Sequence, residues 1–183
     1  MQSELLIDEM LAQSRAFLRA VEGLKQLDWD ALTWKESPAS WNILECVEHL
    51  NLYGDFYLPQ MERKINGSIG KPDPTFKSGL LGNYFAQSMV PKEKLNKMKT
   101  FADKNPIHAE LDLGVIQRCI DQQKVWMRLL EQARGVSLNR VKIPTSFSRL
   151  IQLKLGDAFR FFINHQLRHL AQIERIRAAR QQA

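Results

Sequence analysis

The sequence predicts an all-α protein, a four-helix bundle that occupies residues 1–183 as a single domain. Four long segments repeat their apolar residues with the 3.6-residue period of a helix, and none sustains the two-residue alternation of a strand. A chain of this length can bury about 70% of its unfolded surface in one core. Four amphipathic helices of 20 or more residues are typical of a bundle.

The first helix is expected over residues 4–27, along an apolar stripe of Leu6, Met10, Phe17, Val21 and Leu24. The second is expected over 40–66, with Ser40 as its N-cap and Asn66-Gly67 as its stop signal. These two helices supply the first half of the predicted bundle.

The third helix is expected over 112–133 and the fourth over 153–179. Residues 67–111 form a long connection between the second and third helices, rich in glycine and proline, in which 91–98 favours a short helix. Such a connection can run from one end of the bundle to the other. The second and third helices therefore need not be antiparallel neighbours.

Composition excludes several classes of protein. The chain is 44% hydrophobic and 25% charged, and it lacks the run of about 18 apolar residues that a membrane helix needs. Its acidic start does not resemble a secretory signal, and Cys46 and Cys119 have no motif spacing, so we expect a cytoplasmic protein with reduced cysteines. The net charge of +6 is concentrated in residues 135–183. Without a recognition motif, this favours a solvated helix end over nucleic-acid binding.

Histidines fall on the inward faces of two predicted helices. On the fourth helix, His165 and His169 continue the stripe that includes Phe162 and Ile173. On the second helix, the inward stripe at helical spacing consists of Trp41, Glu45, His49, Leu52 and Phe56. Burying an imidazole without a partner costs about 1–3 kcal/mol for each unmet polar atom, so something must satisfy these three rings.

A divalent metal would satisfy them, because an i, i+4 pair presents two nitrogens on one side of a helix and a third can come from across the groove. Three ligands leave coordination positions open, as in catalytic sites. Glu45 is then a candidate hydrogen-bond acceptor for a ligand or a general base. The alternative is that the histidines are core residues bonded to Glu45 or to water; the His-x-x-x-His pair alone is a weak motif.

Two stretches carry a family resemblance: Ser40-Trp41-x-x-x-Glu45-x-x-x-His49-Leu50 and His165-x-x-x-His169-x-x-Gln172-Ile173. Together with the helix order they resemble the DinB/YfiT-like superfamily over essentially the whole chain. The resemblance implies a four-helix bundle in which His49, His165 and His169 bind nickel, zinc or iron. It also implies a metal-dependent enzyme that uses a low-molecular-weight thiol, such as bacillithiol or mycothiol. It does not imply DNA binding.

The sequence therefore favours a thiol transferase that acts on an electrophilic small molecule, with Trp41, Phe162 and Gln172 as pocket candidates. A hydrolase that uses a metal-activated water, with Glu45 as base, is one alternative. A non-catalytic metal-binding or dimerising bundle is another, and a homodimer is compatible with either. The aromatic residues are more often plain core than a substrate platform, and Gln172 can bind a ligand or only local backbone.

Overall fold

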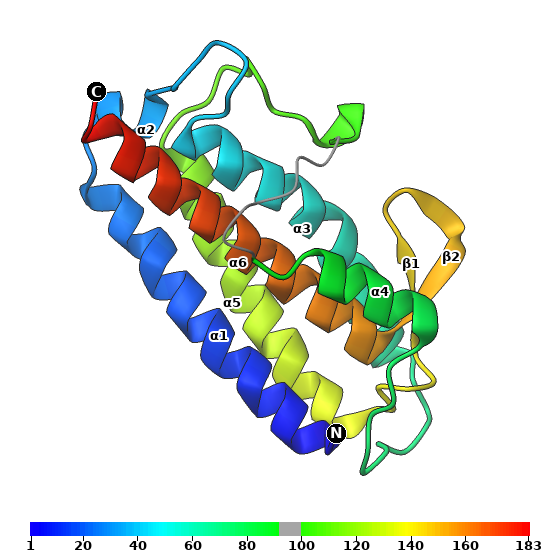
Figure 1. Ribbon diagram of the computed structural model, residues 1–183. Helices are drawn as coiled ribbons and strands as arrows, with labels where there is room; N and C mark the ends of the chain where they lie inside the picture. The colour runs from blue at the N-terminus through cyan, green and yellow to red at the C-terminus, as the bar shows by residue number, and fades with distance from the viewer. Residues whose placement is uncertain (92–99) are drawn as a thin grey trace.

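The computed structural model describes residues 1–91 and 100–183, apart from the side chain of Arg149. Most of the described chain is helical (Figure 1). The long helices are α1 (Ser3–Gly23), α3 (Ile43–Asn66), α5 (Gly114–Gln132) and α6 (Leu155–Arg180), and the shorter ones are α2 (Trp29–Thr33) and α4 (Leu80–Ser88). The helical ranges predicted from apolar periodicity are thus confirmed to within three residues at most ends.

The four long helices pack side by side, with α1 and α3 each in contact with both α5 and α6. Helix α5 runs parallel to α3, since Glu48 pairs with Arg118 and Glu62 pairs with Arg128 further along both helices. It runs antiparallel to α1, whose Ser14 accepts a hydrogen bond from Nε1 of Trp126 at 3.0 Å. The long 67–111 connection makes the parallel arrangement possible, because it returns the chain to the end at which α3 began (Figure 1).

Helix α3 begins later than the sequence predicted. Its N-cap is Asn42, whose Oδ1 accepts the N–H of Glu45 at 2.8 Å while the Glu45 carboxylate accepts the N–H of Asn42 at 2.9 Å. This reciprocal pair is a capping box, which satisfies two N–H groups that the helix leaves unbonded. The prediction of Ser40 as N-cap is wrong, because its hydroxyl instead closes a turn with Ser37. Trp41 therefore precedes the helix.

A β-hairpin corrects the all-α prediction. Strands β1 (Lys142–Thr145) and β2 (Ser148–Lys154) pair antiparallel, with Ile143 opposite Leu153 and an irregularity between Pro144 and Thr145. Ile143 and Leu153 point into the core. The strands are short and one contains proline, so they carry too little alternation to predict. The connection also contains α4, which packs on α6; the short helix predicted at 91–98 lies almost wholly outside the described residues.

The core consists of two apolar clusters along the helices. One surrounds Trp126, Phe159 and Phe162 near the hairpin, and the other surrounds Phe17, Ile43 and Ile173 toward the opposite end. Several polar side chains are buried as well, among them the histidines of α3 and α6. In the described part of the chain, every helix is too short or too polar to span a membrane.

Candidate metal site

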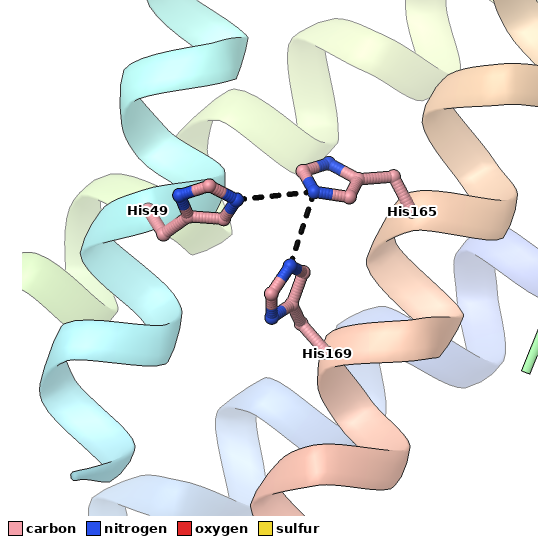
Figure 2. A group of neighbouring side chains, drawn as sticks. All are labelled: His49, His165 and His169. Carbon is pink, nitrogen blue, oxygen red and sulfur yellow. Dashed lines mark hydrogen bonds between the residues drawn. The ribbon is translucent and has the colours of Figure 1, made fainter. Parts of the chain in front are cut away.

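Three imidazoles from two helices converge on one point. His49 projects from α3, and His165 and His169 project from α6 (Figure 2). Nε2 of His165 lies 3.1 Å from Nε2 of His49 and 3.0 Å from Nε2 of His169. The three side chains are buried, between 3% and 7% exposed, and their ligand atoms all lie within 4.8 Å of one another. The sequence prediction that these histidines meet is confirmed.

The outer nitrogens of two of these rings are fixed by acceptors. Nδ1 of His49 donates to the backbone carbonyl of Lys104 at 2.6 Å, and Nδ1 of His169 donates to Oε1 of Gln172 at 3.0 Å. A neutral imidazole carries one N–H, so both rings present the Nε2 lone pair to the point of convergence. Nδ1 of His165 has no hydrogen-bond partner among the described residues.

Burial keeps the rings neutral. Desolvation lowers the pKa of His49 to about 4, and the hydrogen bond to Lys104 offsets only part of that shift. The pKa values of His165 and His169 are lowered well below the ordinary range, first by burial and then by the charges of neighbouring groups, including Arg168. Neutral imidazole is the form that binds a metal, so the three nitrogens are available as ligands at physiological pH.

A divalent cation fits the donor set better than protons do. A proton on Nε2 of His165 could bridge to only one neighbour at full strength, whereas a cation binds all three Nε2 lone pairs; Nδ1 of His165 has no partner among the described residues in either case. A cation bound about 2.1 Å from each Nε2 would hold nitrogens about 3.0–3.4 Å apart for bond angles between 90° and 109°. The two separations that His165 makes, 3.0 and 3.1 Å, suit this geometry, and the three ligand atoms together lie within 4.8 Å of one another. The cluster is therefore compatible with a divalent metal site.

Aromatic rings enclose the histidines. The Trp41 ring lies 4.8 Å from that of His49 and stacks on that of His169 at 5.9 Å, centroid to centroid. Tyr53, one turn after His49 on α3, lies 4.6 Å from the ring of His165. These contacts hold the rings in place and exclude bulk water from the buried side of the cluster.

The cluster forms part of the wall of a cavity of about 1210 Å³. The cavity is bordered by α3, α4, α6, the hairpin turn and the segments before α3 and after residue 99. Trp41 and Gln172, two of the pocket candidates from the sequence, lie on its wall. A ligand in this cavity can thus reach the histidines from the side that the helices leave open.

Phe162, the third pocket candidate from the sequence, lies in the core of the described structure. Its ring packs on Trp126 at 4.3 Å, inside the core, and it is not part of the cavity wall in the described structure. Phe161 lines the cavity in its place and stacks on His165 at 5.9 Å. Phe161 is four residues before His165 and Phe162 is three, which places them on opposite sides of the histidine stripe. Position 162 consequently faces α5.

Glu45 is buried one turn before His49 on α3, and its carboxylate accepts hydrogen bonds from three other groups. Its carboxylate accepts hydrogen bonds from Nζ of Lys35 at 2.7 Å, from the N–H of His108 at 2.8 Å and from the N–H of Asn42 at 2.9 Å. No bond to a ring nitrogen of the three histidines occurs among the described residues. His108 has an exposed side chain, while its N–H contributes to this network.

Sequence reasoning missed several residues around the cluster. The partner of His49 is a backbone carbonyl, which has no side-chain signature in the sequence. Arg168 and Arg175 line the cavity, although Arg168 reads as a solvated residue from the helical pattern. Spacing was the available signal, because Arg168, Gln172 and Arg175 are four and three residues apart and so share one face of α6.

One protein-family model matches most of the chain. The family model described as the DinB superfamily matches residues 10–173, which include all three histidines. Comparison with curated proteins and with solved structures finds no match. The matched range extends from the first turns of α1 to the histidine-bearing part of α6, and it covers most of the chain. The chain therefore belongs to the DinB superfamily.

Proposed function

We propose that this protein is a metalloenzyme built on a DinB/YfiT-like four-helix bundle, which transfers a low-molecular-weight thiol to an electrophilic small molecule. The observation that carries the proposal is the convergence of three neutral, buried Nε2 atoms on one point at the wall of a large cavity. Nickel, zinc and iron all accept three imidazole ligands, and the donor set does not distinguish among them.

His49, His165 and His169 would hold the ion, and Lys104 and Gln172 would orient two of the ligand rings through Nδ1. Bound there, a divalent cation would lower the pKa of a coordinated thiol and so supply a nucleophilic thiolate. Three protein ligands leave positions for such a molecule on the cavity side. Trp41 and Tyr53 would shield the ligand rings from water, which strengthens electrostatic interactions within the site.

The hydrogen bonds that the Glu45 carboxylate already accepts favour thiol transfer over hydrolysis. Hydrolysis needs a general base close to the attacking water. The candidate from sequence, Glu45, already accepts hydrogen bonds from Lys35, Asn42 and His108, which leaves its carboxylate poorly placed to take a proton. A thiol requires no such base once it is ionised.

Metal content tests the site. Tag-free protein purified without nickel resin should contain close to one equivalent of a first-row divalent metal by mass spectrometry. His165→Ala should lose that metal, whereas His108→Ala, which changes the exposed histidine outside the cluster, should retain it. Retention of metal by His165→Ala, or absence of metal after reconstitution with each candidate ion, would refute the site.

Thiol transfer is tested separately on the reconstituted protein. Loss of free thiol is followed with monobromobimane as electrophile and a panel of thiols that includes bacillithiol, mycothiol, glutathione and cysteine. The proposal expects a metal-dependent acceleration with at least one thiol, absent in His165→Ala. A metal-loaded protein that accelerates none of these reactions, yet hydrolyses ester or amide substrates, would replace transfer by hydrolysis.

A further inference from the structure

Aromatic side chains from three separate segments meet at the wall of the cavity. Phe85 of α4 packs against Phe147 of the hairpin turn with ring centroids 5.3 Å apart, and Phe101 stacks on Phe147 at 6.1 Å. Tyr84 lies beside Phe85 at 5.7 Å. All four residues line the cavity, and we refer to them together as the aromatic wall.

The aromatic wall lies next to the histidine cluster, because α4 packs along α6 (Figure 1). Nδ2 of Asn164 donates to the backbone carbonyl of Ala86 at 2.9 Å. This bond joins the neighbour of His165 on α6 to the neighbour of Phe85 on α4. Phe161, one turn before His165, also lines the cavity and stacks on the His165 ring at 5.9 Å. The aromatic wall and the candidate metal site are therefore adjacent parts of one cavity.

Polar groups in this part of the cavity already have partners within the protein. Oγ of Ser88 donates to the backbone carbonyl of Phe85 at 2.8 Å, and the N–H of Ser146 donates to the hydroxyl of Tyr57 at 3.3 Å. Among the described residues that line the cavity, the charged ones come from α6 and from the segment before α3. What the aromatic wall offers a ligand is thus mainly apolar contact, which suits an apolar molecule better than a polar one.

Three rings of the aromatic wall are open to solvent. Tyr84 is 66% exposed, Phe101 is 52% exposed and Phe147 is 38% exposed. A ligand that covers such rings removes apolar area from water, and this stabilises the complex. Exposed aromatic side chains that gather at a cavity are therefore typical of a surface that binds an apolar molecule.

We propose that the aromatic wall binds the electrophilic reactant of the transfer, and that this reactant carries an uncharged apolar group of aromatic size. This deepens the proposed function and rests on it, since the histidines and their metal take the thiol and the adjacent wall takes the other reactant. The cavity volume of about 1210 Å³ supports it, because a single drug-sized ligand needs about 300–1000 Å³ and room remains for a small thiol.

Binding to the aromatic wall is tested with Prodan, an uncharged naphthalene dye whose emission moves to shorter wavelength in apolar surroundings. Prodan should bind the protein saturably, with or without metal. Phe147→Ala should weaken this binding by about five-fold or more, as expected for the loss of one aromatic contact. Phe101→Ala should do the same from a different segment of the chain, so a local defect in the hairpin would not explain both results.

Leu150→Ala is the matched control for these variants. Leu150 lies on the same hairpin as Phe147 and is 95% exposed, and in the described structure it is not part of the cavity wall. Its truncation should leave the affinity for Prodan unchanged. Phe101 and Phe147 are exposed positions as well, so all three variants are expected to fold.

The assignment to the electrophile is tested on metal-loaded protein with a thiol that it accepts. Iodoacetamide is compared with N-phenyliodoacetamide, which has the same reacting carbon and adds one ring. In both reactions the thiolate sulfur forms a bond to the CH2 carbon, iodide leaves with the electron pair of the C–I bond, and the thiol proton passes to solvent. The wild type should favour the phenyl compound in kcat/KM. Phe147→Ala should lower that preference by about five-fold, and Leu150→Ala should retain it.

The two arms separate failure of this inference from failure of the proposed function. Absence of saturable Prodan binding, or equal binding by the wild type, Phe147→Ala and Phe101→Ala, would overturn the aromatic wall as a binding surface. A weakened affinity for Prodan with an unchanged preference between the two electrophiles would overturn the assignment of the reactant. Absence of turnover with every thiol would refute the transfer and this assignment with it, whereas Prodan binding would still report on the wall.

Discussion

Oε1 of Glu45 accepts the N–H of His108 at 2.8 Å, which ties the segment before α5 to the first turn of α3. The same segment carries Lys104, whose carbonyl fixes Nδ1 of His49 at 2.6 Å. Glu45 and His49 lie one turn apart on α3, and both bind this segment. The carboxylate thus has an indirect connection to a ligand ring through the backbone of residues 104–108.

Glu45→Gln should lower both the stability and the metal affinity. Glutamine cannot accept all three donors, and it loses the ion pair with Lys35, so unfolding should become easier by about 1–3 kcal/mol. The released segment would orient His49 less well, and the metal dissociation constant should rise. Denaturant unfolding and metal competition titration measure the two effects.

Glu48→Gln provides the control for Glu45. Glu48 lies on the same helix, but within the described structure it pairs with Arg118 of α5 and not with the histidines. A variant of Glu45 that binds metal as tightly as the wild type, and has lost only turnover, would favour a direct role as base instead.

Gln172→Ala should weaken metal binding with little effect on folding. Its Oε1 accepts the Nδ1 proton of His169 at 3.0 Å, which directs the Nε2 lone pair toward the other two rings. Loss of such an orienting partner usually costs about 10- to 100-fold in metal affinity. Gln181→Ala, at the exposed end of α6, should bind metal like the wild type. Equal affinities in the two variants would show that the ring needs no such support.

Apolar periodicity was sufficient to predict the long helices and the meeting of the three histidines, because both depend on which face of a helix is buried. It was not sufficient for the start of α3, since Ser40 and Asn42 are both good N-caps and the choice depends on a reciprocal bond with Glu45. The hairpin and the role of the Lys104 carbonyl could not be predicted from the sequence, for another reason. Both depend on contacts between distant segments that leave no local pattern in the sequence.

Phe161→Ala and Phe162→Ala should differ, although the residues are adjacent. Phe162 packs on Trp126 in the closed core, so its truncation leaves a void and should cost about 3–5 kcal/mol. Phe161 borders the cavity, where truncation enlarges an existing space, and the cost should be at most about 3 kcal/mol. Thermal or denaturant unfolding of the metal-free variants provides the comparison. A larger loss in Phe161→Ala would contradict the assignment of Phe162 to the core.

Stability of the metal-free protein should fall as the pH is lowered from about 6.5 to 5. The unfolded chain binds protons at its histidines from about pH 6.5 downward, whereas folded His49 binds one only near its pKa of about 4, and His165 and His169 also resist protonation. The unfolded state therefore holds more protons in this window, so acidification favours it by up to about 1.4 kcal/mol per pH unit for each buried ring.

The slope of this pH dependence can be assigned to particular residues. His49→Gln should reduce the slope by about one proton in chelated protein, whatever its effect on stability at pH 7.5, because one buried titrating ring is removed. Denaturant midpoints measured between pH 7.5 and 5 give the slopes of the wild type and of the variant. A stability that is constant or rises over this range would mean that the three rings are not held neutral, and a cation would then have to compete with protons for all three Nε2 atoms.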